Sequence, residues 1–279
     1  MRRLLLALFL AVACRPPADR PSAQPPAHRI VSLAPSSTEL LFALGAGDQV
    51  VGRTTWCRYP PAALRVPTVG DGLNPNIEAI ADRHPDLVVL YRSQLNEAAA
   101  TQLARLGIPS VTLAQDRLED IAHAARELGR LTGHAVTGDS IGAAIETLLT
   151  APAPPPAAAP QARVAFVVWD NPPMVIGGGS YLDQLATLAG AANVFHDLSA
   201  ASATVSIETI VARDPDFILV LSDSTAPPAY SGRREWRAIR AVRERRFIML
   251  PADLFGRPSP SAPAAVAALR RSLESQTRR

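Results

Sequence analysis

The chain has 279 residues, of which 48% are hydrophobic, and a formal net charge of +3 from 28 basic and 25 acidic residues. This length allows one large or two small globular domains with a substantial core. All the basic residues are arginines, and they are scattered without a dense basic stripe, which argues against nucleic acid as a partner.

The first residues resemble a bacterial lipoprotein signal peptide. Arg2 and Arg3 precede a short apolar run that ends in small residues before Cys14. The run is too short to cross a bilayer, which needs about 20 apolar residues. We expect cleavage of the signal peptide, residues 1–13, and lipidation of Cys14, which would anchor the protein on a membrane surface. The alternative is an ordinary secretory signal followed by a coincidental cysteine.

Patterns of strands and helices alternate after a Pro-rich tether at residues 14–28. Between residues 29 and 133, strands are predicted at 29–33, 50–52, 87–90 and 110–113. Helices are predicted from Ser36 or Ser37 to Gly45, over 94–106 and over 118–131. Such alternation favours a mainly parallel sheet, and we expect residues 29–133 to form an N-terminal lobe.

An internal repeat indicates that the chain contains a second, similar lobe. Residues 77–90 and 207–220 share Ile, Glu, Ile, Arg, Pro and Asp at the same spacing. Each copy is typical of a short helix, a Pro-Asp break and a buried strand. Asn76 and Ser206 are the expected N-caps of the two helices.

The second lobe is predicted at residues 161–279, with strands at 163–169, 217–221 and 247–250 and a helix within 260–275. The connecting segment is 134–160. An apolar stripe over residues 134–150 predicts one helix of about 25 Å, and the Pro-rich residues after it cannot continue the helix. A single stiff crossing predicts two lobes with little hinge motion.

Several further sequence segments occur in a specific order before, between and after the two repeat units. They are RIVSLAPSSTE at 29–39, YPP at 59–61, NPP at 171–173, GGGS at 177–180 and DLFGRPSP at 253–260. In this order the chain resembles the helical-backbone periplasmic binding proteins for cobalamin, ferric siderophores and haem, and is most similar to the cobalamin-binding branch. The resemblance covers roughly residues 29–273.

The resemblance implies an α/β fold of two similar lobes with mainly parallel sheets, joined by a long helix, with a ligand cleft between them. It implies a monomeric binding protein of the periplasm or cell exterior, without catalytic activity or cofactor. Its partners would be a small metal chelate and the permease dimer of an ABC importer. The expected ligand is cobalamin or a related corrinoid, and a ferric siderophore or haem is the alternative.

Two glutamates occupy equivalent positions in the repeat units. The resemblance implies that Glu78 and Glu208 engage arginines of the permease through charge-assisted hydrogen bonds, which fix the register of docking. The alternative is purely structural, because an acidic residue in the first turn complements the helix dipole.

The resemblance also implies that the ligand contacts loops that face the cleft. Aromatic faces suit a flat macrocycle, and an arginine can bind a carboxamide, phosphate or carboxylate, or form an ordinary ion pair instead. The predicted ligand-binding residues are Trp56, Tyr59, Asp71, Asn74, Asn171, Met174, Asp253, Phe255 and Arg257. Where cobalamin binders have an aromatic residue before the second repeat unit, this chain has Ser202-Ala203-Thr204, which weakens the case for cobalamin.

A two-domain α/β enzyme with an active site in the cleft is the less favoured alternative, since it would need clustered cysteines or histidines. Cys57 is interpreted as a buried structural residue, because a single thiol is a poor metal site. The histidines have no metal-ligand spacing, so no metal site is predicted, and only His196 lies near the expected pocket. The glycines at 177–179 lack the lysine of a phosphate-binding loop and are interpreted as a flexible entry into a helix.

Overall fold

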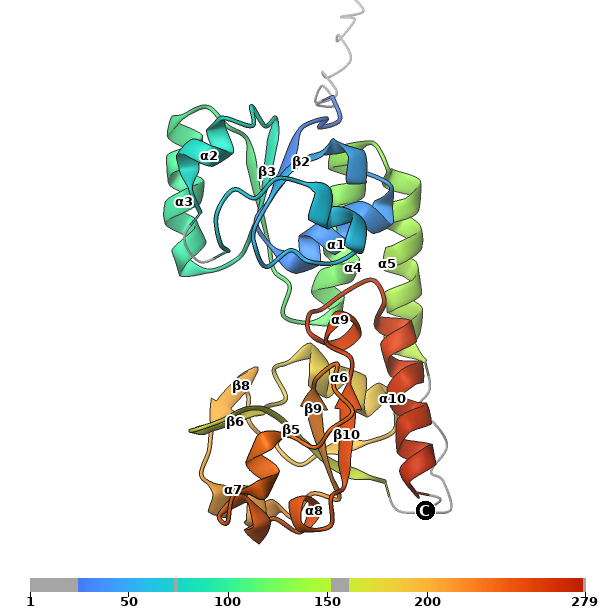
Figure 1. The fold of residues 1–279 in the computed structure, drawn as a ribbon. Helices are drawn as coiled ribbons and strands as arrows, with labels where there is room; N and C mark the ends of the chain where they lie inside the picture. The colour runs from blue at the N-terminus through green and yellow to red at the C-terminus, as the bar shows by residue number, and fades with distance from the viewer. Residues whose placement is uncertain (1–24, 73–74, 152–160, 278–279) are drawn as a thin grey trace, which may run out of the picture.

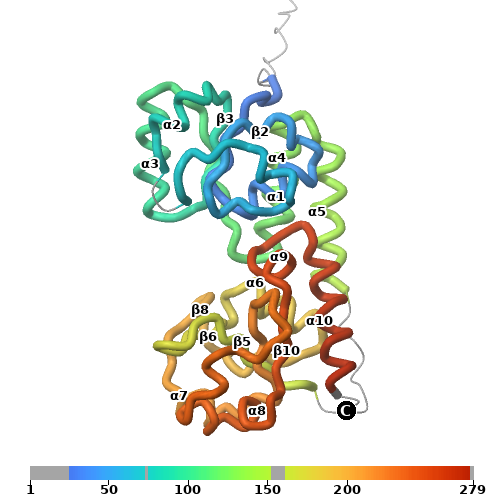
Figure 2. Tube along the Cα trace, viewed as in Figure 1, coloured from blue at the N-terminus to red at the C-terminus, as the bar shows by residue number. Residues whose placement is uncertain are grey.

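The structure, a computed structural model, describes residues 25–72, 75–151 and 161–277. It has two lobes, each with its own sheet, placed one after the other along a set of long helices (Figures 1 and 2). This arrangement confirms the predicted fold class. Cys14 and Asn74 lie outside the described residues. Among the helices that are described, none has both the length and the apolar character needed to cross a membrane.

The N-terminal lobe is built on a four-stranded sheet of order β2-β1-β3-β4. All its strand pairs are parallel, as the sequence pattern predicts. Apolar side chains are buried on both faces of this sheet. Its strands are β1 (Ile30–Ser32), β2 (Val50–Arg53), β3 (Leu87–Tyr91) and β4 (Ser110–Leu113). Its α-helices are α1 (Pro35–Leu44), α2 (Ile77–Ala81), α3 (Gln94–Arg105) and α4 (Leu118–Thr132).

The C-terminal lobe has a mixed sheet of order β10-β9-β5-β6-β8, in which β7 also pairs with β5. The pairs of β5 with β7 and β9, and of β9 with β10, are parallel, whereas β6 and β8 add antiparallel strands that the sequence pattern did not predict. The chain reverses at Asn171-Pro172, directly after β5, so β6 runs antiparallel to β5, and β8 then pairs antiparallel with β6. The strands are β5 (Arg163–Asp170), β6 (Pro173–Ile176), β7 (Ala192–Asn193), β8 (Ser202–Thr204), β9 (Phe217–Leu221) and β10 (Phe247–Leu250). The α-helices are α6 (Tyr181–Leu188), α7 (Ile207–Arg213), α8 (Arg240–Arg243), α9 (Ala252–Phe255) and α10 (Ala262–Thr277).

Residues at and before the first turn explain where several helices begin. The side chains of Asn76 and Ser206 accept hydrogen bonds from backbone N–H groups in the first turns of α2 and α7, which confirms both predicted caps. The start of α1 differs from the prediction, since Ser36 and Ser37 lie buried inside the helix and Pro35 is its first residue. Proline suits this position because its missing N–H would have no partner there.

The internal repeat extends to a matching set of contacts in the two lobes. The backbone N–H of Arg29 donates to Asp86 over 2.9 Å, and that of Arg163 donates to Asp216 over 3.0 Å. In both lobes the guanidinium of the same arginine donates to a carbonyl at the end of the repeat helix. The Pro-Asp break therefore ties the helix end to the start of the central strand twice, once in each lobe.

One helix pair belongs to both lobes. The predicted connecting helix is present as α5 (Ala135–Thr150), and it lies beside α4 (Figures 1 and 2). The two backbones approach so closely that a Cβ atom at Gly138 would meet the carbonyl oxygen of Ala125 at 2.4 Å. The first turns of α4 and the later part of α5 pack into the C-terminal core, whereas the later part of α4 packs into the N-terminal core.

The glycine loop before α6 is packed rather than loose, which corrects the interpretation as a flexible entry. The backbone N–H groups of Gly177 and Gly178 donate to the carbonyls of Ala201 and Leu198. A Cβ atom at either glycine would lie 2.2–2.3 Å from a carbonyl oxygen of the facing segment. Glycine is needed here because two stretches of backbone are in direct contact.

Candidate ligand-binding cleft

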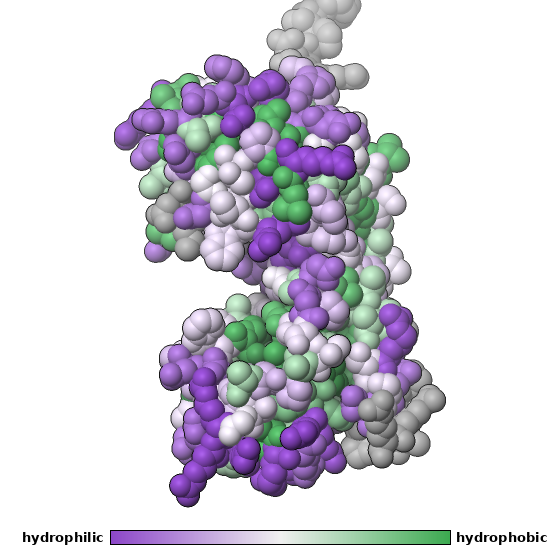
Figure 3. Space-filling view, in the orientation of Figure 1, coloured by the Kyte–Doolittle hydropathy of each residue, from purple (hydrophilic) through white to green (hydrophobic). Residues whose placement is uncertain are grey.

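An open cleft with a volume of about 620 Å³ lies between the lobes. Figure 3 shows the surface hollowed at this level, on the side away from α5. From the N-terminal lobe it is lined by loops at the carboxyl ends of β1, β3 and β4, the edge at which open α/β sheets bind ligands. The lining residues are Leu33, Ala34, Pro35, Ser36, Trp56, Gly72, Tyr91, Gln115, Asp116, Ser180, Tyr181, Ala201, Ala252, Gly256, Arg257 and Pro258.

Two of the predicted ligand residues line this cleft, and a third, Tyr59, contacts one of them. Trp56 lines it with an indole that is 62% exposed. Arg257 lines it from the opposite lobe, and its guanidinium carbon lies 4.5 Å from the ring centroid of Tyr59. Tyr59 thus supports the arginine by a cation–π contact. The cleft is thus lined by one exposed aromatic face and by one guanidinium that Tyr59 supports.

The other predicted residues that the structure describes are not among those that line the cleft. Asp71 directly precedes the lining residue Gly72. Asn171 and Met174 belong to the turn and strand that follow β5, and Asp253 is exposed in the first turn of α9. Phe255 is 1% exposed and packs in the C-terminal core.

The side chain of Phe255 therefore supports the cleft from behind, and its carbonyl accepts a hydrogen bond from the hydroxyl of the lining residue Tyr181.

Arg257 also joins the two lobes through a buried ion pair. Its Nε donates to the carboxylate of Glu39 on α1 over 2.5 Å, and the side chains are 12% and 4% exposed. Ser261 donates to the other oxygen of Glu39 over 3.3 Å. Burial raises the pKa of Glu39, and the charge of Arg257 with the serine hydroxyls offsets part of this rise. Arg257 therefore forms an ion pair between the lobes, which is the alternative that the sequence left open for this residue.

Sequence reasoning missed the polar lining residues of the N-terminal lobe. Tyr91 ends β3, and Gln115 and Asp116 follow β4. The hydroxyl of Tyr91 donates to Asp116 over 2.5 Å. Both strands were predicted, so polar residues directly after their carboxyl ends were a usable signal for this site.

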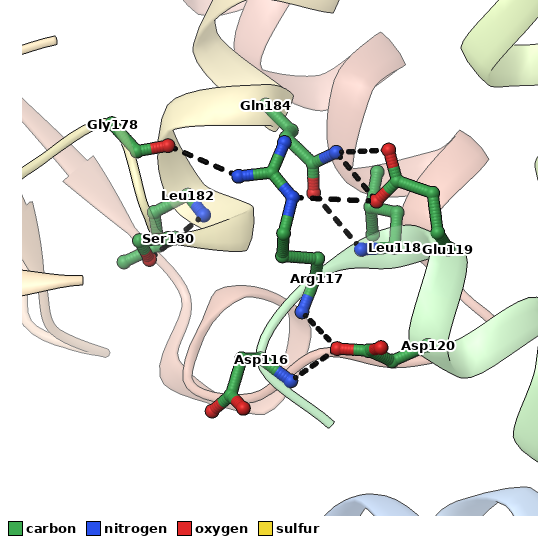
Figure 4. A network of polar contacts seen from close by, with 9 residues as sticks. All are labelled: Asp116, Arg117, Leu118, Glu119, Asp120, Gly178, Ser180, Leu182 and Gln184. Carbon is green, nitrogen blue, oxygen red and sulfur yellow. Dashed lines mark hydrogen bonds and ion pairs between the residues drawn. The ribbon is translucent and has the colours of Figure 1, made fainter. Parts of the chain in front are cut away.

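A polar network fixes the lobe junction next to these residues (Figure 4). The guanidinium of Arg117 donates to the carbonyl of Gly178 over 3.1 Å, and the backbone N–H of Leu118 donates to the side-chain oxygen of Gln184 over 2.9 Å. The amide nitrogen of Gln184 in turn donates to both oxygens of Glu119. The start of α4 is therefore held against the start of α6, directly after the lining residue Asp116.

Cys57 and His196 both lie outside the cleft lining. Cys57 is buried, as predicted, with its sulfur 3.1 Å from the hydroxyl of Thr54. His196 is paired over 2.8 Å with the buried carboxylate of Asp183 at the start of α6. Both side chains are engaged in contacts within their own lobe.

The two matching glutamates are exposed on the surface, Glu78 in the first turn of α2 and Glu208 in that of α7. Figure 1 shows these helices on different lobes, on the side of the molecule away from α5. Hydrogen bonds from its own backbone N–H and from Ser206 lower the pKa of Glu208, so this carboxylate is ionised at neutral pH.

Comparison with known proteins agrees with this architecture. The sequence profile of the periplasmic binding proteins matches residues 30–254. The chain belongs to the periplasmic binding protein family. It is 27% identical over 245 residues to a vitamin B12-binding protein of Vibrio cholerae, a match that covers 86% of this chain and 87% of the relative. It is 32% identical over 194 residues to a vitamin B12-binding protein of Salmonella paratyphi A, covering 70% of this chain and 72% of the relative.

Solved structures of this family have the same fold. The periplasmic vitamin B12 binding protein BtuF of Vibrio cholerae is 26% identical, has a TM-score of 0.74 and matches 91% of this chain and 99% of its own. The periplasmic heme-binding protein BhuT, in complex with two hemes, has a TM-score of 0.76 at 24% identity, covering 88% of this chain and 98% of its own. As a periplasmic binding protein, this chain binds a ligand and is not an enzyme, and proteins of this family deliver ligands to ABC permeases.

The buried pair of Glu39 and Arg257 gives a first testable prediction, for the variants Glu39→Gln, Arg257→Met and the double variant. Each single substitution leaves a buried group without its partner, so the loss in the double variant should be smaller than the sum of the single losses. We expect a coupling energy of about 0.5–3 kcal/mol from urea unfolding of the four proteins. Additive losses would contradict a direct interaction.

The same coupling should depend on pH. The pKa of Glu39 is raised from 4.5 in the folded protein, so its ionisation costs stability as the pH rises above 4.5. Arg257 offsets this cost only when Glu39 is ionised. The difference in unfolding free energy between the parent and Arg257→Met should therefore grow as the pH is raised above 4.5, where Glu39 becomes ionised. In the Glu39→Gln background, the effect of Arg257→Met should not change with pH.

Proposed function

We propose that this protein captures cobalamin or a related corrinoid in the cleft and delivers it to the permease dimer of an ABC importer. The observation that carries the proposal is a preformed cleft between two lobes with the exposed indole of Trp56 at its wall. A flat macrocycle can stack on such a ring. Relatives named vitamin B12-binding proteins match the chain over most of its length, which supports the same ligand class.

The proposed mechanism is capture without chemistry. The ligand displaces water from an open site that needs little rearrangement, because both lobes are already held in place. Trp56 supplies stacking area on one wall. Arg257, held by Glu39 and Tyr59, supplies a fixed donor on the other. A haem or ferric-siderophore carrier of the same architecture is the alternative ligand assignment.

Titration of the purified chain by calorimetry with cyanocobalamin, hemin and ferrichrome tests the ligand. We expect cyanocobalamin to bind most tightly. The Trp56→Ala variant should bind it about tenfold more weakly, a loss of about 1.4 kcal/mol, because the stacking surface is removed. Trp56→Phe should keep most of the affinity because it retains an aromatic face. Tight binding of hemin or ferrichrome without binding of cyanocobalamin would replace the corrinoid assignment.

The proposed docking surface comprises the exposed carboxylates of Glu78 and Glu208. Their equivalent places in the two lobes would present one carboxylate to each subunit of a symmetric permease dimer, as a monomeric binding protein requires. Bidentate pairing with arginines would fix the register of the complex. The ligand would then face the permease from the cleft between these two contacts.

Replacing both glutamates by alanine tests docking separately from binding. The Glu78→Ala, Glu208→Ala double variant should bind cyanocobalamin like the parent protein yet support little uptake by cells. The matched control replaces two exposed carboxylates of the helical backbone, Asp139 on α5 and Glu274 on α10, by alanine. The control should support uptake at the parent rate. Parental uptake by the docking variant would remove the assignment.

The proposed location is the periplasm or cell exterior, with a lipid anchor on Cys14, a residue outside the described part of the chain. Acyl chains contribute about 0.8 kcal/mol per buried CH₂ group, enough to retain the protein on a membrane. Cys14→Ala should therefore move the protein from the membrane fraction to the soluble fraction after cell disruption. Equal membrane association of the parent and the variant would exclude the anchor.

A further inference from the structure

One acidic side chain of the cleft has no cationic partner. Among the described residues that line the cleft, Asp116 and Arg257 are the charged ones. Arg257 is neutralised by Glu39 at 2.5 Å. Asp116 is exposed in the cleft, and no arginine or histidine of the described chain forms an ion pair with it. Among these described lining residues, the charge that has no counter-ion is therefore negative, and a bound ligand would meet it.

The backbone of Asp116 is held from both lobes. Its N–H donates to the carboxylate of Asp120 over 3.0 Å, and its carbonyl accepts a hydrogen bond from the N–H of Tyr181 across the lobe junction, also over 3.0 Å. Figure 4 shows its side chain pointing away from the network formed by Arg117 and Gln184. The backbone that carries this carboxylate is thus held in place on both sides.

Tyr91 orients this carboxylate. Its hydroxyl donates to one oxygen, Oδ1, over 2.5 Å, which leaves Oδ2 available to a ligand. Burial and the negative charge of Asp116 raise the pKa of Tyr91 to about 12, so the phenol stays protonated and keeps donating at neutral pH. A carboxylate fixed in this way accepts hydrogen bonds well and repels another carboxylate.

The tyrosines of the lining are also engaged. The hydroxyl of Tyr181 donates to the carbonyl of Phe255, and that of Tyr91 donates to Asp116. Burial raises the pKa of Tyr181 as well, which disfavours the phenolate that would coordinate a ferric haem. Within the described lining there is no histidine. These groups suit a ligand whose metal needs no axial ligand from the protein.

We infer that Asp116 is a specificity-determining residue of the cleft, which favours ligands that present uncharged hydrogen-bond donors such as primary carboxamides and disfavours ligands that present carboxylates. The inference rests on the proposed function and narrows its ligand class. A corrinoid carries a rim of carboxamides, whereas haem carries two propionates. Asp116 would accept from an amide N–H through Oδ2 and would meet a propionate with like-charge repulsion.

A matched pair of probes isolates this effect. Dicyanocobinamide and dicyanocobyrinic acid share one corrin ring, and the second carries carboxylates where the first carries amides. We expect the parent protein to bind the amide form more tightly. In Asp116→Asn this preference should fall by roughly tenfold, about 1.4 kcal/mol, because the repulsion is removed and the side chain keeps its size. Asp48→Asn, which removes an exposed charge from the same lobe, should leave the preference unchanged.

The salt dependence of the preference distinguishes charge repulsion by Asp116 from a purely structural role of this residue. High ionic strength screens charge repulsion in an open cleft, so it should narrow the preference of the parent more than that of Asp116→Asn. Equal binding of the two probes by the parent, or the full preference in Asp116→Asn, would overturn the inference while binding of dicyanocobinamide still supports the proposed function. If the parent binds neither corrinoid, the proposed function fails, and this inference fails with it.

Discussion

The packing of α4 against α5 is the constraint on which the rest of the molecule depends. Leu118 and Ile121 of α4 and Ile145 of α5 belong to the C-terminal core, while Ala125 and Leu128 of α4 belong to the N-terminal core. Moving one lobe relative to the other would therefore expose apolar surface, at about 25 cal/mol for each Å². The glycine contact at the helix crossing lets the two backbones lie close together. The cleft is consequently set by the hydrophobic effect before any ligand binds, which lowers the ordering cost of binding.

Polar contacts between the lobes then fix the features of their arrangement that apolar packing does not determine. The ion pair of Glu39 with Arg257 crosses the base of the cleft, and the contacts of Arg117 and Gln184 fasten the start of α4 to that of α6. Buried charges are costly unless they are paired, and that cost makes the contact of Glu39 with Arg257 specific for one arrangement of the lobes. Their position also decides the chemistry of the site. The arginine at the cleft is neutralised by Glu39, whereas the carboxylate of Asp116 lines the cleft without an ion-pair partner in the described part of the chain.

The internal duplication explains the features that the two lobes share, and the lobes also differ at identifiable places. The contact between a strand-opening arginine and the aspartate of the Pro-Asp break occurs in each lobe, and it places α2 and α7 equivalently. The lobes differ where the C-terminal half adds β6 and β8 and where the segment around α9 reaches the other lobe through Arg257. The repeated units therefore give the two lobes matching outer helices, whereas the added strands and the segment around α9 make the lobes differ next to the cleft.

The sequence by itself determined the repeated units, the order of strands and helices in the N-terminal lobe, the caps at Asn76 and Ser206 and the long connecting helix, because these depend on local periodicity and on hydrogen bonds between near neighbours. It did not determine the antiparallel strands after β5, whose pairing joins distant residues. Only the tertiary structure decided that Phe255 faces the core, that Arg257 meets a glutamate 218 positions away, and that Tyr91 orients Asp116. Such contacts depend on how two separately patterned lobes pack together, and that information is distributed over the whole chain rather than written in any one segment.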